Sequence, residues 1–166
     1  METFDHDFGS AGQGKLIPHG IYDVMNHHAH MHLNVSHDTS ALWCDSVALW
    51  WEQAGRTAHP QATRMLVLGD GGGSKSATQY RCKEDLQGLA NRLGLEIRGA
   101  HSPPYCSKHN WIERTQTTTG LRVTVRSLDK AYQTGRKYAA DFKHNMKILF
   151  DDHLPKWNYR AVPECP

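Results

Sequence analysis

Residues 65–74 read Met-Leu-Val-Leu-Gly-Asp-Gly-Gly-Gly-Ser, and this stretch decides the fold class. The apolar run 65–68 ends at Gly69, a pattern typical of a strand that is buried on both faces. Residues 77–93 follow with apolar side chains at helical spacing and a stop at Gly94, and residues 95–100 form another short strand-like run. A strand, a helix and a second strand in this order predict a mixed sheet in an α/β domain.

The segments before this unit predict a hairpin and a helix. Residues 16–24 and 30–35 resemble two short strands, which we expect to pair antiparallel across residues 25–29. Asp38 or Thr39 can cap a helix that ends at Gly55. One stripe of this helix carries Trp43, Val47, Trp50, Trp51 and Ala54. The tryptophans could stack on nucleic-acid bases, but we expect them to pack under a sheet face.

After residue 105 the spacing of apolar side chains indicates helices and strands less clearly. Residues 111–114 could open a helix, residues 121–128 predict a strand, and residues 138–150 predict an amphipathic helix that ends near Pro155. His28, His30 and His32 share one face of the second strand, which is open to two interpretations, a zinc site or a histidine-rich strand surface.

Composition excludes several classes of protein. The 166 residues suit one domain, and 39% hydrophobic with 22% charged residues argues against wholesale disorder. No run of 18 apolar residues occurs, so we expect no membrane span. The four cysteines lie far apart, which suits reduced thiols and a cytoplasmic location.

The charge is unevenly distributed along the chain. Residues 1–100 hold 8 Lys and Arg against 11 Asp and Glu, whereas residues 101–166 hold 11 against 6. This basic C-terminal third favours an anionic partner such as nucleic acid. Its lysines and arginines either follow a phosphate backbone or form a solvated helix face: Arg136, Lys137, Lys143, Lys147 and Lys156.

The glycine-rich loop after the buried strand has three interpretations. A phosphate-binding P-loop needs G-x-x-x-x-G-K-[ST], but Ser74 stands where the second glycine is required before Lys75. Alternatively, Asp70 itself is the functional group, because open α/β sheets bind ligands at the carboxyl ends of their strands. A third, structural interpretation is that Asp70 caps the turn.

A second informative stretch is residues 102–114, Ser-Pro-Pro-Tyr-Cys-Ser-Lys-His-Asn-Trp-Ile-Glu-Arg. Together with the Asp-Gly-Gly-Gly-Ser of residues 70–74, it resembles the DDE-type insertion-sequence transposases, in particular the Rhodopirellula-type (ISAzo-type) DDE domain. The similarity is collinear over nearly the whole chain and includes residues 6–8, 17–23, 36–39, 50–51, 117–122, 132–135 and 157–160.

The resemblance implies a fold and a chemistry. We expect a ribonuclease H-like mixed sheet with flanking helices, a partial catalytic core at residues 1–114 and a small α+β C-terminal extension at residues 115–166. Family members hold two Mg²⁺ (or Mn²⁺) ions with three acids and cleave and join DNA at the element's terminal repeats. By residue matching, Asp70 is the second acid and Glu113 the third, both catalytic and metal-binding.

The resemblance also implies residues and partners for binding DNA. Ser107, Lys108 and Asn110 match the family string beside the glutamate and are candidate DNA-binding residues. We expect DNA as the partner and no association with a membrane. Assembly into a homo-oligomer is an open alternative.

Two departures from the family pattern are expected to matter. The first acid belongs on a first strand upstream of anything in this sequence, and Asp5, Asp7 and Asp23 are either replacements or ordinary turn and surface acids. Relatives also continue with a few dozen residues of helix after the third acid, whereas Arg114 runs almost directly into Thr115. Loss of the first strand exposes a backbone edge on both its neighbours, so the halves close up or the chain is unstable.

We therefore expect a truncated, internally deleted and catalytically impaired transposase. A non-catalytic DNA-binding remnant and a P-loop-like nucleotide-binding protein are the alternatives.

Overall fold

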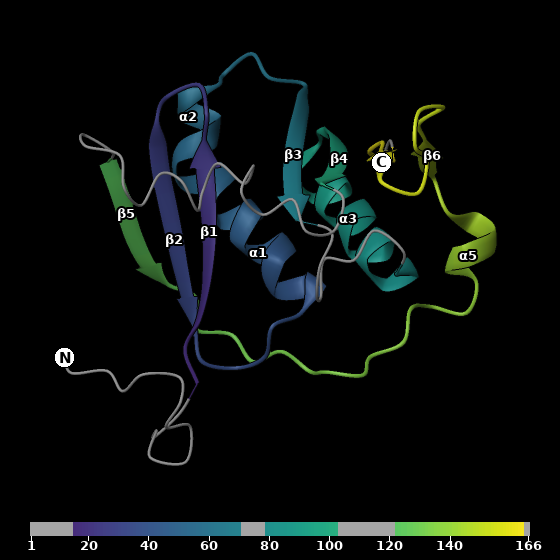
Figure 1. Ribbon diagram of the computed structural model, residues 1–166, viewed down its shortest axis with the longest axis horizontal. Coiled ribbons are helices and arrows are strands. Elements are labelled where there is room, and N and C mark those ends of the chain that lie inside the picture. Colours follow the sequence, from purple (N-terminus) through teal and green to yellow (C-terminus); the bar gives the residue numbers. More distant parts are fainter. Residues whose placement is uncertain (1–14, 71–78, 103–121, 165–166) are drawn as a thin grey trace.

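The computed structural model describes residues 15–70, 79–102 and 122–164, and it has the predicted α/β class (Figure 1). The elements, in chain order, are β1 (Ile17–Asp23), β2 (His28–Asn34), α1 (Ser40–Trp50), the π-helical turn η2 (Trp51–Gly55), α2 (Arg56–Ala58), β3 (Arg64–Asp70), α3 (Tyr80–Leu93), β4 (Glu96–Ser102), β5 (Arg122–Ser127), α5 (Phe142–Asn145), β6 (Ile148–Phe150) and β7 (Asn158–Ala161). The strands form two mixed sheets.

The first sheet has the strand order β1-β2-β5. β1 and β2 pair antiparallel from Ile17 opposite Asn34 to Asp23 opposite His28, which confirms the predicted hairpin. β5 comes from the C-terminal third and pairs parallel with β2. Asn34 fixes this junction, because its Nδ2 donates to the carbonyl oxygens of Leu128 and Lys130 at 2.5 and 2.9 Å.

The second sheet has the order β3-β4-β7-β6. β3 and β4 are parallel, with Asp70 opposite Ser102 at their carboxyl ends. α3 connects them and ends, as predicted, at Gly94, whose φ of +67° suits glycine. β7 and β6 add an antiparallel pair beyond β4.

α1 begins at the predicted cap but does not stop at the predicted residue. Thr39 is extended, and its side chain accepts a hydrogen bond from the Leu42 N–H at 3.1 Å. Gly55 keeps helical geometry (φ −60°), and the helix continues to Ala58. The prediction that Gly55 ends the helix is wrong, because this glycine provides space: a Cβ there would lie 2.7 Å from Trp51 Cε3.

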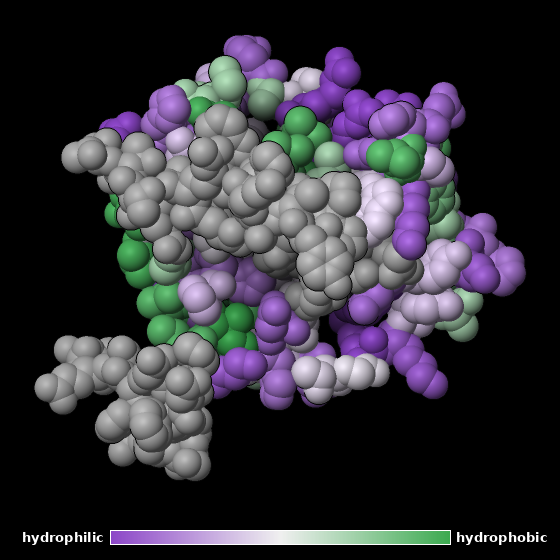
Figure 2. All heavy atoms as spheres, in the orientation of Figure 1, coloured by the Kyte–Doolittle hydropathy of each residue, from purple (hydrophilic) through white to green (hydrophobic). Residues whose placement is uncertain are grey.

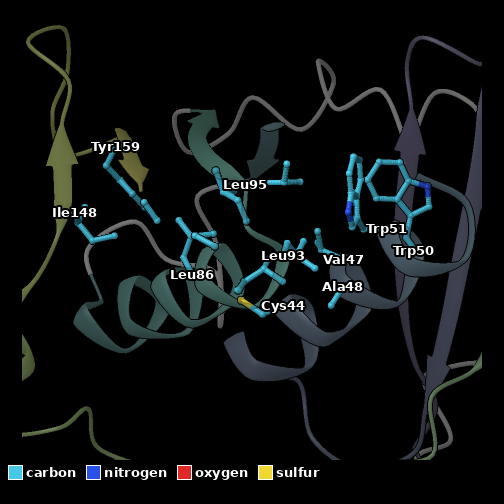
Figure 3. Packing of buried hydrophobic residues seen from close by; sticks show 14 residues of the cluster. Cys44, Val47, Ala48, Trp50, Trp51, Leu86, Leu93, Leu95, Ile148 and Tyr159 are labelled. Atoms are coloured by element: carbon cyan, nitrogen blue, oxygen red, sulfur yellow. The ribbon is translucent and has the colours of Figure 1, made fainter. Parts of the chain in front are cut away.

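The core lies between the helices and both sheets. Figure 3 shows α1 side chains meeting those of α3, with Trp50 and Trp51 packed at the hairpin side and Tyr159 at the other. Trp50 and Trp51 are only 8% and 4% exposed. The expectation that these two tryptophans pack in the core is therefore confirmed.

β3 is not buried on both faces. Met65 and Val67 pack against the core, whereas Leu66 and Leu68 are 61% and 60% exposed. The prediction of a doubly buried strand is wrong, because in the described part of the chain the helices cover only one face of β3.

The predicted helix 138–150 is also wrong. Only Phe142–Asn145 is helical, and Met146 is already extended (φ −60°, ψ 125°). Residues 148–150 instead form β6, because they pair with β7. Long-range pairing thus overrides the local helical pattern.

β1 and β3 are edge strands of their sheets. Within the described residues neither has a second β partner. Figure 1 shows β5, β2, β1, β3 and β4 in a row, with α1 visible between β1 and β3. Among the described residues the strands form two separate sheets, so the expected closing of the two halves into one sheet is not seen there.

Candidate functional site

The carboxyl ends of β3 and β4 form the edge at which the predicted catalytic residues belong. Asp70 is the last residue of β3, and its backbone pairs with Ser102, the last residue of β4. Parallel neighbours lie about 4.8 Å apart, so both following segments leave the sheet at nearly the same point. This is the location at which α/β sheets place ligands.

The segment that follows β4 carries the other predicted site residues. Ser107, Lys108, Asn110 and Glu113 all lie outside the described residues, as do residues 71–78 with the glycine-rich loop and Lys75. The structure therefore places the backbone of Asp70 beside the start of the segment with Glu113, and does not test the residues beyond.

His101 packs beneath this edge. It pairs with Gly69 in the β3–β4 register, and its Nε2 lies 2.9 Å from the buried Tyr159 hydroxyl. The ring lies against Gly69, where a Cβ would make an ordinary contact of 3.8 Å with His101 Nδ1. Burial raises the pKa of the Tyr159 phenol, which therefore stays a neutral partner for His101. The contact holds β7 against the end of β4.

Lys83 of α3 extends the same cluster. Its Nζ lies 4.8 Å from the centre of the Tyr159 ring and 5.7 Å from that of Phe150. The residue is only 4% exposed, and burial lowers the pKa of its amine. The sequence analysis missed this cluster because it did not predict β6 and β7. The one indication of it in the sequence was Tyr159, within the family-like stretch 157–160.

Asp23 does not lie at this edge. It ends β1 at the hairpin, where its carboxylate accepts from the Asn26 side chain at 2.7 Å and lies 2.9 Å from His59 Nε2. Figure 1 shows the hairpin at the opposite end of the strands from the carboxyl end of β3. Burial alone would raise the pKa of Asp23, but hydrogen bonds from Asn26 and His59 lower it. Asp23 is thus a turn residue, while Asp5 and Asp7 lie outside the described residues.

A pocket of about 500 Å³ lies where the N-termini of α1 and α3 meet residues 130–136. Ser40 donates to Asp85 at 2.5 Å, and Arg81 binds the same carboxylate. Burial raises the pKa of the Asp85 carboxyl, although Ser40 and Arg81 favour its charged form. Arg81 and Asp85 therefore pair with each other inside the pocket, whereas its Asp38 and Lys130 form ion pairs with His19 and Asp45.

The three alternating histidines share the face of β2 that meets the helices. His28 and His30 stack with centroids 4.2 Å apart, and His30 meets Trp50 edge-on. Burial, with His28 and His32 nearby, lowers the pKa of His30 to about 4. Among residues 15–70, 79–102 and 122–164, no group of three or more His, Cys, Asp or Glu side chains could hold a metal ion.

The basic side chains singled out in the C-terminal third are all exposed: Arg136, Lys137, Lys143, Lys147 and Lys156. They do not share one helix face, because the helix predicted for residues 138–150 is not formed. Figure 2 shows another surface feature, an apolar strip along the side where β5 lies, and Val123 and Val125 there are 52% and 56% exposed. The helices within the described ranges are all too short or too polar to cross a membrane.

Comparison with known proteins gives one match. The sequence model of the family described as the Rhodopirellula transposase DDE domain matches residues 1–115 and, in a second segment, residues 110–163. Neither curated proteins nor solved structures give a match.

Proposed function

The chain belongs to the Rhodopirellula transposase DDE domain family, and from this premise we propose that it derives from an enzyme that cleaves and joins DNA with divalent metal ions. The register of β3 and β4 is the observation that supports a site at Asp70. It brings the backbone of Asp70 beside Ser102, from which the segment with Glu113 departs. Ten residues lie between Ser102 and Glu113, enough chain to return to the strand ends.

Asp70 and Glu113 are the proposed metal ligands. Carboxylate oxygens suit Mg²⁺ and Mn²⁺, which are hard cations. Bound there, a pair of such ions would activate the attacking hydroxyl and stabilise the leaving oxygen. The chain's own part is to hold Asp70 at the end of β3, beside the end of β4, a support that the His101–Tyr159 contact reinforces.

We propose that the 166-residue polypeptide by itself is catalytically impaired. None of its residues matches the family's first acid, and Asp23 is held in the hairpin turn. The two segments matched by the family model overlap at residues 110–115, and this supports the internal deletion that the resemblance implies after Glu113. The boundary between residues 114 and 115 is thus proposed as a sequence junction within one folding unit, because β5 and β7 join the sheets formed by the first part.

Metal binding and DNA cleavage test these assignments separately. Mn²⁺ binding, followed by the loss of the free-ion paramagnetic resonance signal, should weaken at least about tenfold in Asp70→Asn and Glu113→Gln. Asp152→Asn, an exposed acid, is the matched control. Equal Mn²⁺ affinity in all four proteins would refute the ligand assignment. Cleavage of terminal-repeat DNA that depends on Asp70 would instead refute the impairment.

DNA binding without cleavage is the second candidate function. The exposed lysines and arginines of residues 136–156 and the basic balance of residues 101–166 favour it. Affinity for duplex DNA should fall steeply from about 50 to 200 mM salt, because phosphate contacts release counterions. Lys143→Gln with Lys147→Gln should flatten this salt dependence, whereas Arg56→Gln, an exposed cation of the acidic part, should not. A salt-independent affinity would exclude this function.

A further inference from the structure

Three histidines lie on the face of β2 that meets the helices: His28, His30 and His32, here called the histidine row. His30 and His32 are only 6% and 1% exposed. Residues 29, 31 and 33 alternate with the row, so the apolar side chains of β2 belong to its opposite face. Imidazole rings therefore make most of the contact between β2 and the helices, where a buried sheet face usually carries aliphatic side chains.

The surroundings of the row suit neutral rings. His28 and His30 stack with centroids 4.2 Å apart, and His30 meets the Trp50 indole of α1 edge-on, with centroids 6.3 Å apart. Nδ1 of His32 is buried and has no hydrogen-bond partner among the described residues. A ring that takes up a second proton gains an N–H donor and a charge, both of which need an acceptor or water.

The charged groups around the row give little support to protonated rings. On β5, Arg122 and Arg126 stand opposite His28 and His32 in the strand register, so they add positive charge. The acids on the neighbouring elements already have basic partners: Asp23 with His59, Asp38 with His19, and Asp45 and Glu52 with Arg92.

Protons therefore bind the row more readily in water than in the folded molecule. Burial, with His28, His32 and Arg126, lowers the pKa of His30 to about 4, although Asp23 acts in the opposite direction. Burial and Arg126 also lower the pKa of His32. Below pH 6.5, a solvated His30 ring takes up a proton that the buried ring does not, so acid favours a state in which the row has left α1. From His30 alone, the ratio of such open molecules to closed ones rises about twentyfold between pH 7 and pH 5.

The other half of the molecule does not rest on the row. In the part of the chain that the structure describes, no strand of the first sheet pairs with a strand of the second. Figure 1 shows β1, β2 and β5 together on one side, and β3, β4 and α3 on the other. Among the described residues of the first sheet, Ile21 alone packs against the main hydrophobic cluster. The second sheet contributes far more to that cluster: Met65, Val67, Ile97, Ile148, Tyr159 and Ala161.

We propose that the histidine row is an acid-operated conformational switch: when its rings take up protons, the first sheet separates from α1 while α3 and the second sheet stay folded. Separation transfers the charged rings to water. It breaks few aliphatic contacts, because Ile21 is the link between the first sheet and the main cluster. The inference uses neither the metal site nor DNA and does not depend on the proposed function.

Amide hydrogen exchange of the full chain, followed by nuclear magnetic resonance from about pH 7.5 to about pH 4.5, measures the opening of each strand. Protection factors remove the intrinsic pH dependence of exchange. Those of β2 should fall at least about twentyfold between pH 7 and pH 5. At about pH 4.5, amides of β1, β2 and β5 should exchange nearly as in an unstructured chain, while those of α3 and β4 stay protected at least about a hundredfold. Return to pH 7 should restore the protection.

Two variants test whether the row causes the change. His30→Phe and His30→Gln keep a neutral side chain at every pH and should remove most of the twentyfold change. With two replacements of different polarity, the test does not depend on one variant that fails to fold at pH 7. His153→Gln, at an exposed position outside the first sheet, is the matched control and should behave like the parent chain.

Three results would overturn the proposal. If α3 and β4 lost protection at the same pH as β1 and β2, acid would unfold the whole molecule and the row would not be a switch. If the first sheet kept its protection down to about pH 4.5, protonation of its histidines would not open it. If both His30 variants kept the pH dependence of the parent chain, groups outside the row would be responsible.

Discussion

Replacing Gly55 and Gly88 separately by alanine should change stability in opposite directions. Both residues are helical, and alanine favours a helix over glycine by about 0.5–1 kcal/mol. Gly88 is exposed on α3, and a Cβ there meets nothing within 4 Å. Gly88→Ala should therefore stabilise the protein by that amount.

The same substitution at Gly55 places a Cβ 2.7 Å from Trp51 Cε3 and 3.2 Å from Trp50 Cη2. Both indoles are buried and have little room to move. Overpacking of this kind costs about 1–3 kcal/mol, which exceeds the gain in helix propensity. Gly55→Ala should thus lose about 1–2 kcal/mol net, or about 2–8 °C in melting temperature for a domain of this size.

Urea and thermal unfolding of the two variants and the parent chain measure the difference. Near-ultraviolet circular dichroism reports whether Trp50 and Trp51 are repacked. If Gly55→Ala were as stable as Gly88→Ala, the close approach of helix backbone and indole rings described above would be incorrect.

Three further predictions concern the cap, the histidines and the hairpin turn. Thr39→Ala removes the acceptor for the Leu42 N–H and should cost about 1 kcal/mol in urea unfolding, whereas Thr39→Ser should recover most of it. His30 resists protonation when folded, with a pKa near 4 against 6.5 unfolded, so the unfolded state binds more protons as the pH falls below 6.5. The free energy of unfolding should drop by about 2 kcal/mol between pH 7 and pH 5 from this residue alone. His30→Phe should remove that part of the pH dependence. An unchanged pH slope in the variant would contradict the burial of a neutral imidazole. Asp23→Ala leaves His59 and the turn amides without their acceptor and should cost about 1–3 kcal/mol, measured by urea unfolding at pH 7; a neutral effect would show that the turn does not need the carboxylate.

The sequence predicted elements whose causes are local. The alternation of residues 30–35 gave β2, the threonine before residue 40 gave the start of α1, and Gly94 gave the end of α3. For the two helix ends the deciding interaction lies within four residues along the chain, as with the Thr39 side chain and the Leu42 N–H, whereas the alternating side chains of β2 are a local pattern whose pairing is with β1.

The failures depend on contacts between distant residues. Gly55 resembles a helix stop unless one knows that two indoles lie against it. Residues 148–150 have a helical pattern, but pairing with β7 makes them a strand. The exposure of Leu66 and Leu68 depends on which elements cover β3, and an apolar run contains no information about that.

The candidate site stays a prediction. A strand that ends in an acid before a glycine-rich turn indicated Asp70, and the structure places that residue at the end of β3, opposite Ser102 of β4. The support from His101, Tyr159 and Lys83 could not be foreseen, because it requires β7 to lie beside β4. The roles of Ser107, Lys108, Asn110 and Glu113 stay predictions.

The pairing of β2 with β5 and of β4 with β7 has a consequence for biosynthesis. Ribosomes release the N-terminal part first, so β2 and β4 leave the exit tunnel long before the partners that complete their sheets. Until residues 158–161 are made, a nascent chain carries an unpaired edge on β4, for which chaperones and aggregation compete. A premature stop codon ten residues before the end of the sequence would delete β7. The second sheet could then not be completed, and its strand edges would stay open to aggregation.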